Sequence, residues 1–274
     1  MFITSTWHQY FSHYDEGLGT TYERFILHRY FEKLHSAYDI QSVLEMPSFG
    51  MTGISGINSI WWAKKGARVT VADADNKRIA MINKVWQNLG IEADFIYQKD
   101  NYSRLPFKDR SFDLSWNFAS LWFVKELEEF LRELVRVTRR AIFICVPNRS
   151  NIASIIAFEA KKHAHVFPNN IRPDRIKGII RNAGWRSVDQ GFFDAPPWPD
   201  IAMKKEDLLR KAGLGFLATR LENKRSDTTC ILDYYGGKNK GMEEDVLKYA
   251  FLEQLPDLFK QFWAHHRYFI FAPP

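Results

Sequence analysis

Short apolar runs alternate with amphipathic stretches through the middle of the chain. Runs of strand length are predicted at 42–45, 68–72, 94–98, 112–116 and 141–147. Between them apolar positions recur at helical spacing, as over 76–89, and helices are also predicted at about 54–65 and 125–140. Strands that alternate with helices of this size predict a parallel sheet with right-handed crossovers.

The same periodicity organises the two ends of the chain. A helix is predicted over 25–38, with an N-cap at Thr20 or Thr21. Late in the chain, a helix opened by Pro173 and closed by Gly184 precedes a strand at 185–193. The chain ends in an aromatic strand, HHRYFIFAPP, and helical patterns at 204–213 and 242–254 lie before it.

Composition limits the class of protein. With 274 residues and 46% hydrophobic residues, the chain suits one large α/β domain. Its apolar runs are far shorter than the roughly 20 residues that span a bilayer, and its first residues lack a basic leader. Two cysteines, Cys145 and Cys230, fit a reducing compartment, so we expect a cytoplasmic protein.

The net charge of +6 does not by itself indicate a nucleic-acid partner. Basic pairs such as Lys64-Lys65 and Arg139-Arg140 are spread along the chain and are expected near helix ends or on solvated faces. Nucleic acid is therefore an unlikely substrate, and an anionic small molecule or a membrane surface is favoured over it.

Polar residues and glycines follow the predicted strands at one edge of the sheet. Glu45 ends the first strand, before a loop with Gly50, Gly53 and Gly56, and Asp73 ends the second. The later strands are followed by Asp100, Asn101, Asn117 and Phe118. Open α/β sheets bind ligands at the carboxyl ends of their strands, and this order of glycines and acid is typical of a nucleotide-binding βαβ unit.

Together with the segment LPF…SFD at 105–113, these positions resemble the class I S-adenosylmethionine-dependent methyltransferases, in particular the branch acting on small molecules and lipids. The resemblance covers residues 42–191 and the last ten residues. It implies an α/β fold with a doubly wound, seven-stranded, mainly parallel sheet whose antiparallel last strand lies between the fifth and sixth. The chain then divides into an N-terminal helical cap (1–41), the cofactor-binding core (42–194), an insertion serving as lid or dimer contact (195–263), and the final strand (264–274).

The resemblance also implies roles for individual residues. Glu45 would bind the ammonium of S-adenosylmethionine, and Asp73, with Ala74 beside it, the ribose. Gly50 and Gly53 would let the backbone approach the cofactor, although Pro47 stands where the family has its first glycine. Asp100 and Asn101 would contact the adenine, Asn117 and Phe118 would face the methionine end, and Tyr14 and Tyr22 would fold over the cofactor.

The catalytic residue is not defined by the sequence. The candidates are His163, His165, Tyr14 and Tyr22, and a structural role is favoured for the two histidines. His265 and His266 are not expected to converge with other candidates, and no residues with metal-ligand spacing are seen, so no metal is predicted.

The resemblance implies methyl transfer from S-adenosylmethionine to a small organic or lipid-like acceptor, by a possible homodimer. An alternative is a non-catalytic protein that binds the cofactor or a nucleoside and acts through a partner. A nicotinamide-dependent oxidoreductase fits poorly, because GxGxxG is missing at the right distance.

Overall fold

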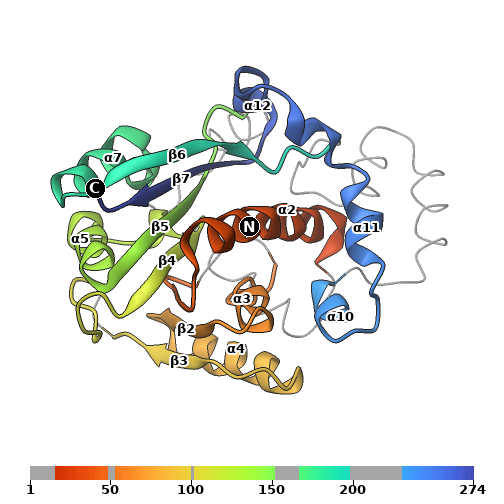
Figure 1. Ribbon diagram of the computed structural model, residues 1–274, viewed down its shortest axis with the longest axis horizontal. Coiled ribbons are helices and arrows are strands. Elements are labelled where there is room, and N and C mark those ends of the chain that lie inside the picture. The colour runs from red at the N-terminus through yellow and green to blue at the C-terminus, as the bar shows by residue number, and fades with distance from the viewer. Residues whose placement is uncertain (1–15, 49–52, 100–101, 152–166, 198–229) are drawn as a thin grey trace.

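A computed structural model describes residues 16–48, 53–99, 102–151, 167–197 and 230–274 (Figure 1). Its strands form one seven-stranded sheet in the order β3-β2-β1-β4-β5-β7-β6. The strands are β1 (Ser42–Glu45), β2 (Arg68–Asp73), β3 (Asp94–Tyr97), β4 (Phe112–Phe118), β5 (Thr138–Pro147), β6 (Arg186–Phe193) and β7 (His266–Ala272). The described helices are α2 (Gly17–Tyr38), α3 (Ile60–Lys64), α4 (Asn76–Asn88), α5 (Leu127–Val137), α7 (Pro173–Asn182), α10 (Ile231–Tyr235), α11 (Met242–Leu247) and α12 (Asp257–Trp263), with 3-10 turns η1 (Leu121–Phe123), η2 (Pro168–Ile171) and η3 (Ala250–Gln254).

The sheet has the predicted mixed pairing. β1 pairs in parallel with β2 and β4, and the parallel register continues to β3 on one side and β5 on the other. β7 runs antiparallel to both β5 and β6 and lies between them. The predicted fold class, with an antiparallel last strand between the fifth and sixth, is confirmed.

Helices cover both faces of this sheet and bury two apolar layers (Figure 1). α2, α3 and α4 pack on one face, where Phe31, Trp62 and Trp116 are fully buried. α5 and α7 pack on the other face, through residues such as Phe130 and Ile176. The two layers hold the carboxyl ends of β1, β2 and β4 side by side, where the candidate site lies.

Several element boundaries differ from the prediction. The helix expected from 54 begins only at Ile60, because Gly56 has a φ of +68°, which a right-handed helix does not admit. α2 begins at Gly17, before the predicted caps, and Glu16 at its N-cap makes no capping bond because its carboxylate contacts Arg24 instead.

The segment around β4 and β5 differs as well. β4 continues through Asn117 to Phe118, two residues beyond the predicted end. α5 ends at Val137 and β5 begins at Thr138, so Arg139 and Arg140 lie in a strand. Both arginines lie just after the end of α5 with their side chains 43% and 41% exposed, as expected, and both form ion pairs with the buried Asp113, at 2.8 and 3.0 Å.

Candidate functional site

The candidate site is a small cavity at the carboxyl end of β1, under helix α2. Its volume is about 10 Å³. Its lining residues are Glu23, Arg24, Glu45, Ser48, Ile54, Ser55, Gly56, Asn58 and Phe118. We call it the β1 cavity. Its walls come from α2, from β1 and the loop after it, and from the last residue of β4.

Glu45 is a buried carboxylate in this wall. It is 2% exposed, and its Oε2 accepts a hydrogen bond of 3.2 Å from the backbone N–H of Ser59. Burial raises the pKa of Glu45 to about 7, and the hydrogen bonds from Ser59 offset only part of that rise. A cation placed beside this buried carboxyl would favour its ionised form and lower its pKa again.

Asp73, at the end of β2, is connected to the β1 cavity through Ser48. The Ser48 hydroxyl donates to Asp73 Oδ2 at 2.9 Å, while Arg78 Nη1 and the backbone N–H of Asp75 donate to Oδ1 at 2.6 and 2.9 Å. Burial raises the pKa of Asp73, against the lowering effect of Arg78 and the hydrogen bonds. The neighbouring Ala74 N–H donates to the Tyr102 hydroxyl at 2.9 Å.

A buried ion pair fastens α2 to the loop after β1. Arg24 forms an ion pair with Glu16 and donates to the carbonyl of Ile54 at 3.0 Å. Glu16 Oε1 in turn accepts from the Ile54 N–H at 2.6 Å. A Cβ on Gly53, whose φ is +70°, would lie 2.4 Å from the same Glu16 oxygen, so Gly53 lets the α2 side chains approach the loop.

The two polar candidates of β4 separate onto opposite faces of the sheet. Phe118 lines the β1 cavity, whereas Asn117 faces the other way because side chains alternate along a strand. Asn117 is fully buried, and neither of its side-chain amide atoms has a hydrogen-bond partner among the described residues. The structure therefore brings Glu45 and Phe118 together, with Asp73 close by, and leaves Asn117 outside their cavity.

The remaining predicted candidates are distributed as follows. Tyr22 is buried on α2, where its hydroxyl donates to Glu253 at 3.0 Å. Burial and Glu253 raise its pKa well above the ordinary range for tyrosine. Six candidates lie outside the described residues: Tyr14, Gly50, Asp100, Asn101, His163 and His165.

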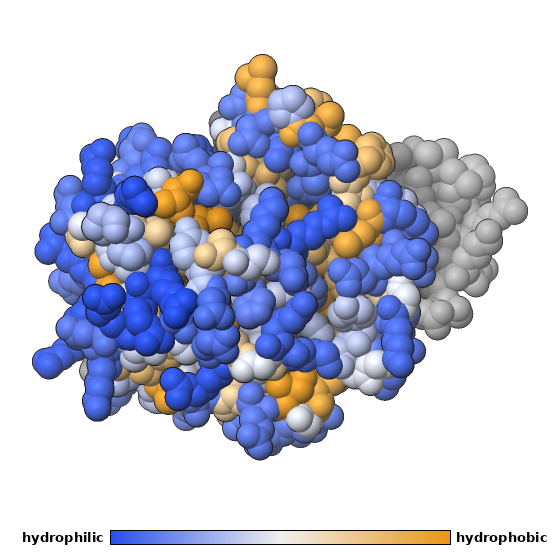
Figure 2. Space-filling model, viewed as in Figure 1, coloured by the Kyte–Doolittle hydropathy of each residue, from blue (hydrophilic) through white to orange (hydrophobic). Residues whose placement is uncertain are grey.

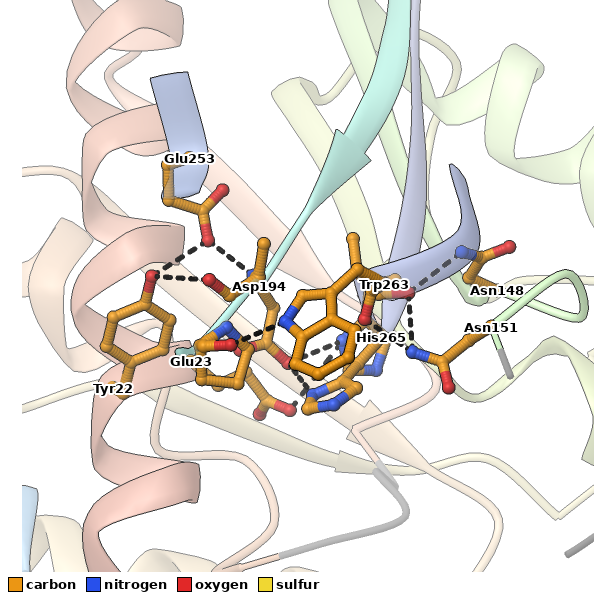
Figure 3. Close-up of polar contacts among 12 residues, drawn as sticks. Tyr22, Glu23, Asn148, Asn151, Asp194, Glu253, Trp263 and His265 are labelled. Atoms are coloured by element: carbon orange, nitrogen blue, oxygen red, sulfur yellow. Dashed lines mark hydrogen bonds and ion pairs between the residues drawn. The ribbon is translucent and has the colours of Figure 1, made fainter. Parts of the chain in front are cut away.

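Next to the β1 cavity lies a polar cluster that the sequence did not predict (Figure 3). Asp194, just after β6, accepts at Oδ2 from the Nδ1 atoms of His265 and His266, at 3.0 and 3.2 Å. Glu23 Oε2 lies 3.8 Å from His266 Nδ1. The expectation that His265 and His266 would not converge with other polar groups was wrong, because the antiparallel β6–β7 pairing brings the end of one strand to the start of the other.

The charge of this cluster is balanced locally. Burial alone would raise the pKa of Asp194, but the charges and hydrogen bonds of His265 and His266 hold it below its ordinary value. No spacing in the sequence could have revealed the cluster, since its members come from positions 23, 194, 265 and 266. The one available signal was the pair of adjacent histidines at the start of an antiparallel strand.

A second cleft, of about 660 Å³, opens between the loop before β4 and α5. Arg136 dominates it, donating to Glu133 and Asp109 and to the carbonyls of Leu105 and Phe107. These bonds fix the loop to the helix. The cleft has none of the strand-end residues described above.

Comparison with known proteins identifies a family for the central part of the chain. Residues 50–145 match the family model of the methyltransferase domain. The match assigns a methyltransferase domain to this part of the chain. S-adenosylmethionine is the cofactor that this resemblance implies.

Solved structures show the same fold at low sequence identity. An S-adenosylmethionine-dependent methyltransferase from Archaeoglobus fulgidus matches with a TM-score of 0.53 and 14% identity over 93% of this chain and 94% of its own. Magnesium protoporphyrin IX methyltransferase from Synechocystis, with bound S-adenosylhomocysteine, gives 0.50 and 15% over 65% and 78%. The YcgJ protein from Bacillus subtilis gives 0.50 and 11% over 89% and 97%. A search of curated protein sequences gives no match.

The chemistry of the β1 cavity of this methyltransferase fits the cofactor. Glu45 is a buried carboxylate suited to an ammonium, and the Ser55 hydroxyl in the same wall has no hydrogen-bond partner within the described part of the chain. Asp73 Oδ2 accepts one hydrogen bond, from Ser48, which leaves it able to accept another. Ligand pockets usually measure hundreds of Å³, so the lining side chains must move to admit a nucleoside to a cavity of about 10 Å³. None of the described helices of this methyltransferase is long and apolar enough to cross a bilayer.

Proposed function

We propose that this methyltransferase transfers the methyl group of S-adenosylmethionine to a small organic or lipid-like acceptor, with a lipid-like one favoured, and that it acts in the cytoplasm. The observation that carries the proposal is an exposed apolar patch on η3 and α12, the segment that leads directly into His265 and the cluster beside the β1 cavity. Both described cysteines are free thiols, in keeping with the proposed location.

The patch contains four large apolar side chains. Phe251, Leu258, Phe259 and Phe262 are 58%, 77%, 46% and 50% exposed. Figure 2 shows orange side chains capping the top of the molecule, over α12. Clustered exposed apolar surface marks a place where a protein meets an apolar partner, whereas single exposed side chains need no explanation. Since α12 leads directly into His265 and the cluster beside the β1 cavity, we infer that an amphiphilic acceptor bound at this surface would direct its reactive head toward that cavity.

Holding the cofactor is assigned to the residues around the β1 cavity. Glu45 binds the ammonium, Asp73 accepts from the ribose hydroxyls after a shift of Ser48 or Arg78, and Phe118 packs against the methionine end. S-adenosylmethionine supplies an already activated methyl group, so the protein acts mainly by orienting the cofactor and the acceptor. Asn117 lies on the opposite face of the sheet, and we do not assign it a contact with the cofactor.

The other parts of the proposal are supported by the arrangement of the chain. Residues 42–194 and 264–274 form the core, and 195–263 the insertion that presents the patch. A second copy of the chain is the other possible occupant of this surface. Magnesium protoporphyrin IX methyltransferase is an example of the fold acting, by its name, on magnesium protoporphyrin IX.

The test is an acceptor screen built from matched pairs. Hydroxyl, amine and carboxylate acceptors are each offered with and without a long alkyl chain, and release of S-adenosylhomocysteine is measured. We expect the alkylated member of one pair to react with a kcat/KM at least tenfold higher. Asp73→Asn should abolish activity by weakening cofactor binding, while Asp75→Asn, which keeps the side-chain cap of α4, should not. Turnover of polar members alone would contradict a lipid-like acceptor, and light scattering of the purified chain tests for a dimer.

A further inference from the structure

Three side chains from distant parts of the chain converge beside the β1 cavity. Glu23 comes from α2, Asp194 follows β6, and His266 begins β7. One ligand atom from each lies within 4.8 Å of the other two, with Asp194 Oδ2 and Glu23 Oε2 at 3.2 and 3.8 Å from His266 Nδ1. These are separations at which two atoms can bind one cation, whose bonds to nitrogen and oxygen are about 2 Å long. The cation would replace the proton that His266 Nδ1 shares with Asp194, and this proton would be released to solvent.

All three side chains are buried, so the free-energy cost of removing their charges from water is high. Glu23, Asp194 and His266 are 7%, 2% and 8% exposed. A divalent cation between the two carboxylates would add to the stabilisation that the histidines already give, because burial and mutual repulsion both penalise the ionised forms. Among the described residues, the ion pairs of Asp194 are made with His265 and His266, and none is made with a lysine or arginine.

The backbone around the cluster is held by a second set of hydrogen bonds (Figure 3). The Asn148 side chain donates to the carbonyl of Ala264 at 2.8 Å, and its N–H donates to the carbonyl of His265 at 2.7 Å. The Trp263 indole donates to the carbonyl of Pro196 at 2.6 Å, and His265 Nδ1 donates to Asp194 Oδ2. Metal sites characteristically have such supporting bonds, which orient the ligands before the ion arrives.

We propose that Glu23, Asp194 and His266 form a binding site for a divalent metal cation. Two carboxylates and one imidazole suit Zn²⁺, Mn²⁺ or Fe²⁺ and are a poor set for a soft monovalent ion. Three protein ligands leave further coordination positions open, as in metal sites that bind a water or a substrate oxygen. His265 is a positioning residue, since it donates to the oxygen with which Asp194 would bind the ion.

The proposed metal site lies next to the β1 cavity, where the cofactor is proposed to bind. Glu23 also lines the β1 cavity, and the ring of Phe118, another lining residue, lies 4.6 Å from the ring of His266. A cation here would bind an oxygen of the acceptor next to the cofactor. That role rests on the proposed methyl transfer, whereas binding of the ion does not.

Metal binding is measured on the full-length protein after treatment with a chelator, without cofactor or acceptor. Calorimetric titration with Zn²⁺, and electron paramagnetic resonance of added Mn²⁺, should each show one site per chain. Asp194→Asn and His266→Gln should each weaken binding at least tenfold. The matched control is Asp189→Asn, a carboxylate on β6 that contacts the Tyr268 hydroxyl and lies outside the cluster.

Two outcomes would overturn the proposal. One is the lack of a stoichiometric site for either ion in a folded protein, which would leave a hydrogen-bonded cluster that only ties β6 to β7. The other is binding that Asp194→Asn and His266→Gln leave unchanged. If Asp194→Asn fails to fold, Glu23→Gln replaces it, and thermal melts verify the fold of each variant. A protein that binds cofactor but neither metal ion refutes this inference and leaves the proposed function standing.

Discussion

At the scale of single residues, Glu45 makes cofactor binding depend on pH. Its pKa is raised by burial to about 7, so its carboxyl is mostly protonated one unit below that value and mostly ionised one unit above it. The ammonium of S-adenosylmethionine pairs with the ionised form. We therefore expect calorimetric affinity to rise about tenfold across this range as the pH increases. Glu45→Gln should bind more weakly and lose this dependence, and an unchanged dependence in the variant would assign it to another group.

The same raised pKa affects stability with the opposite sign. The folded protein holds the Glu45 proton more tightly than the unfolded chain, whose carboxyl has the ordinary pKa of 4.5. The unfolded state therefore loses its proton first as the pH rises, and the free energy of unfolding contributed by this group falls between pH 4.5 and about 7. The free energy of unfolding of Glu45→Gln, measured with denaturant, should lack that decline. This measurement tests the raised pKa of Glu45 without the cofactor.

At the scale of elements, the position of α2 depends on a glycine in the loop after β1. The buried Glu16–Arg24 pair of α2 reaches over Gly53, and a Cβ there would approach Glu16 Oε1, Arg24 Nη2 and Thr20 Cγ2 within 2.4–2.7 Å. Gly66, after α3, also has a positive φ, but a Cβ there would meet nothing within 4 Å. An alanine at either position would be strained by the left-handed backbone conformation. Only at Gly53 would its Cβ also clash with neighbouring side chains.

Comparison of two alanine variants separates these costs. Gly66→Ala should lower the free energy of unfolding by about 1 kcal/mol, from backbone strain alone. Gly53→Ala should cost about 2–4 kcal/mol, because the α2 ion pair must also move. Denaturant unfolding measures both. Equal losses would mean that α2 does not depend on the close approach at Gly53.

The elements themselves were largely predictable, and the site less so. The alternation of strands and helices predicted the parallel sheet. It could do so because the spacing of apolar residues within each segment shows which side of that segment faces the core. The β1 cavity was predictable as far as Glu45 and Phe118, which follow from strand ends. The role of Gly53 was not, because its neighbours are side chains of a helix about 30 residues earlier. Asn117 was predicted to follow β4, whereas the strand continues through it to Phe118, so its side chain takes the face that strand alternation dictates.

At the scale of the whole molecule, net charge and the apolar patch together predict where the enzyme works. The chain carries a net charge of +6, and Phe251, Leu258, Phe259 and Phe262 project from η3 and α12. A positively charged protein with exposed apolar side chains binds anionic bilayers by adding electrostatic attraction to hydrophobic insertion. A lipid-like acceptor would then be reached at the membrane surface.

Flotation with lipid vesicles tests this expectation. The protein should float with vesicles that contain an anionic phospholipid, less with neutral vesicles, and less again at high salt, since salt screens the charges. The double variant Leu258→Ser/Phe262→Ser should lose most of the binding, because each buried large apolar side chain contributes about 1.5–3 kcal/mol. The matched control is Tyr97→Ser, an aromatic residue 44% exposed on β3, which should bind as the unmodified chain does. Equal vesicle binding by the double variant would show that the apolar patch does not bind the membrane. A second copy of the chain would then be the expected partner of the patch.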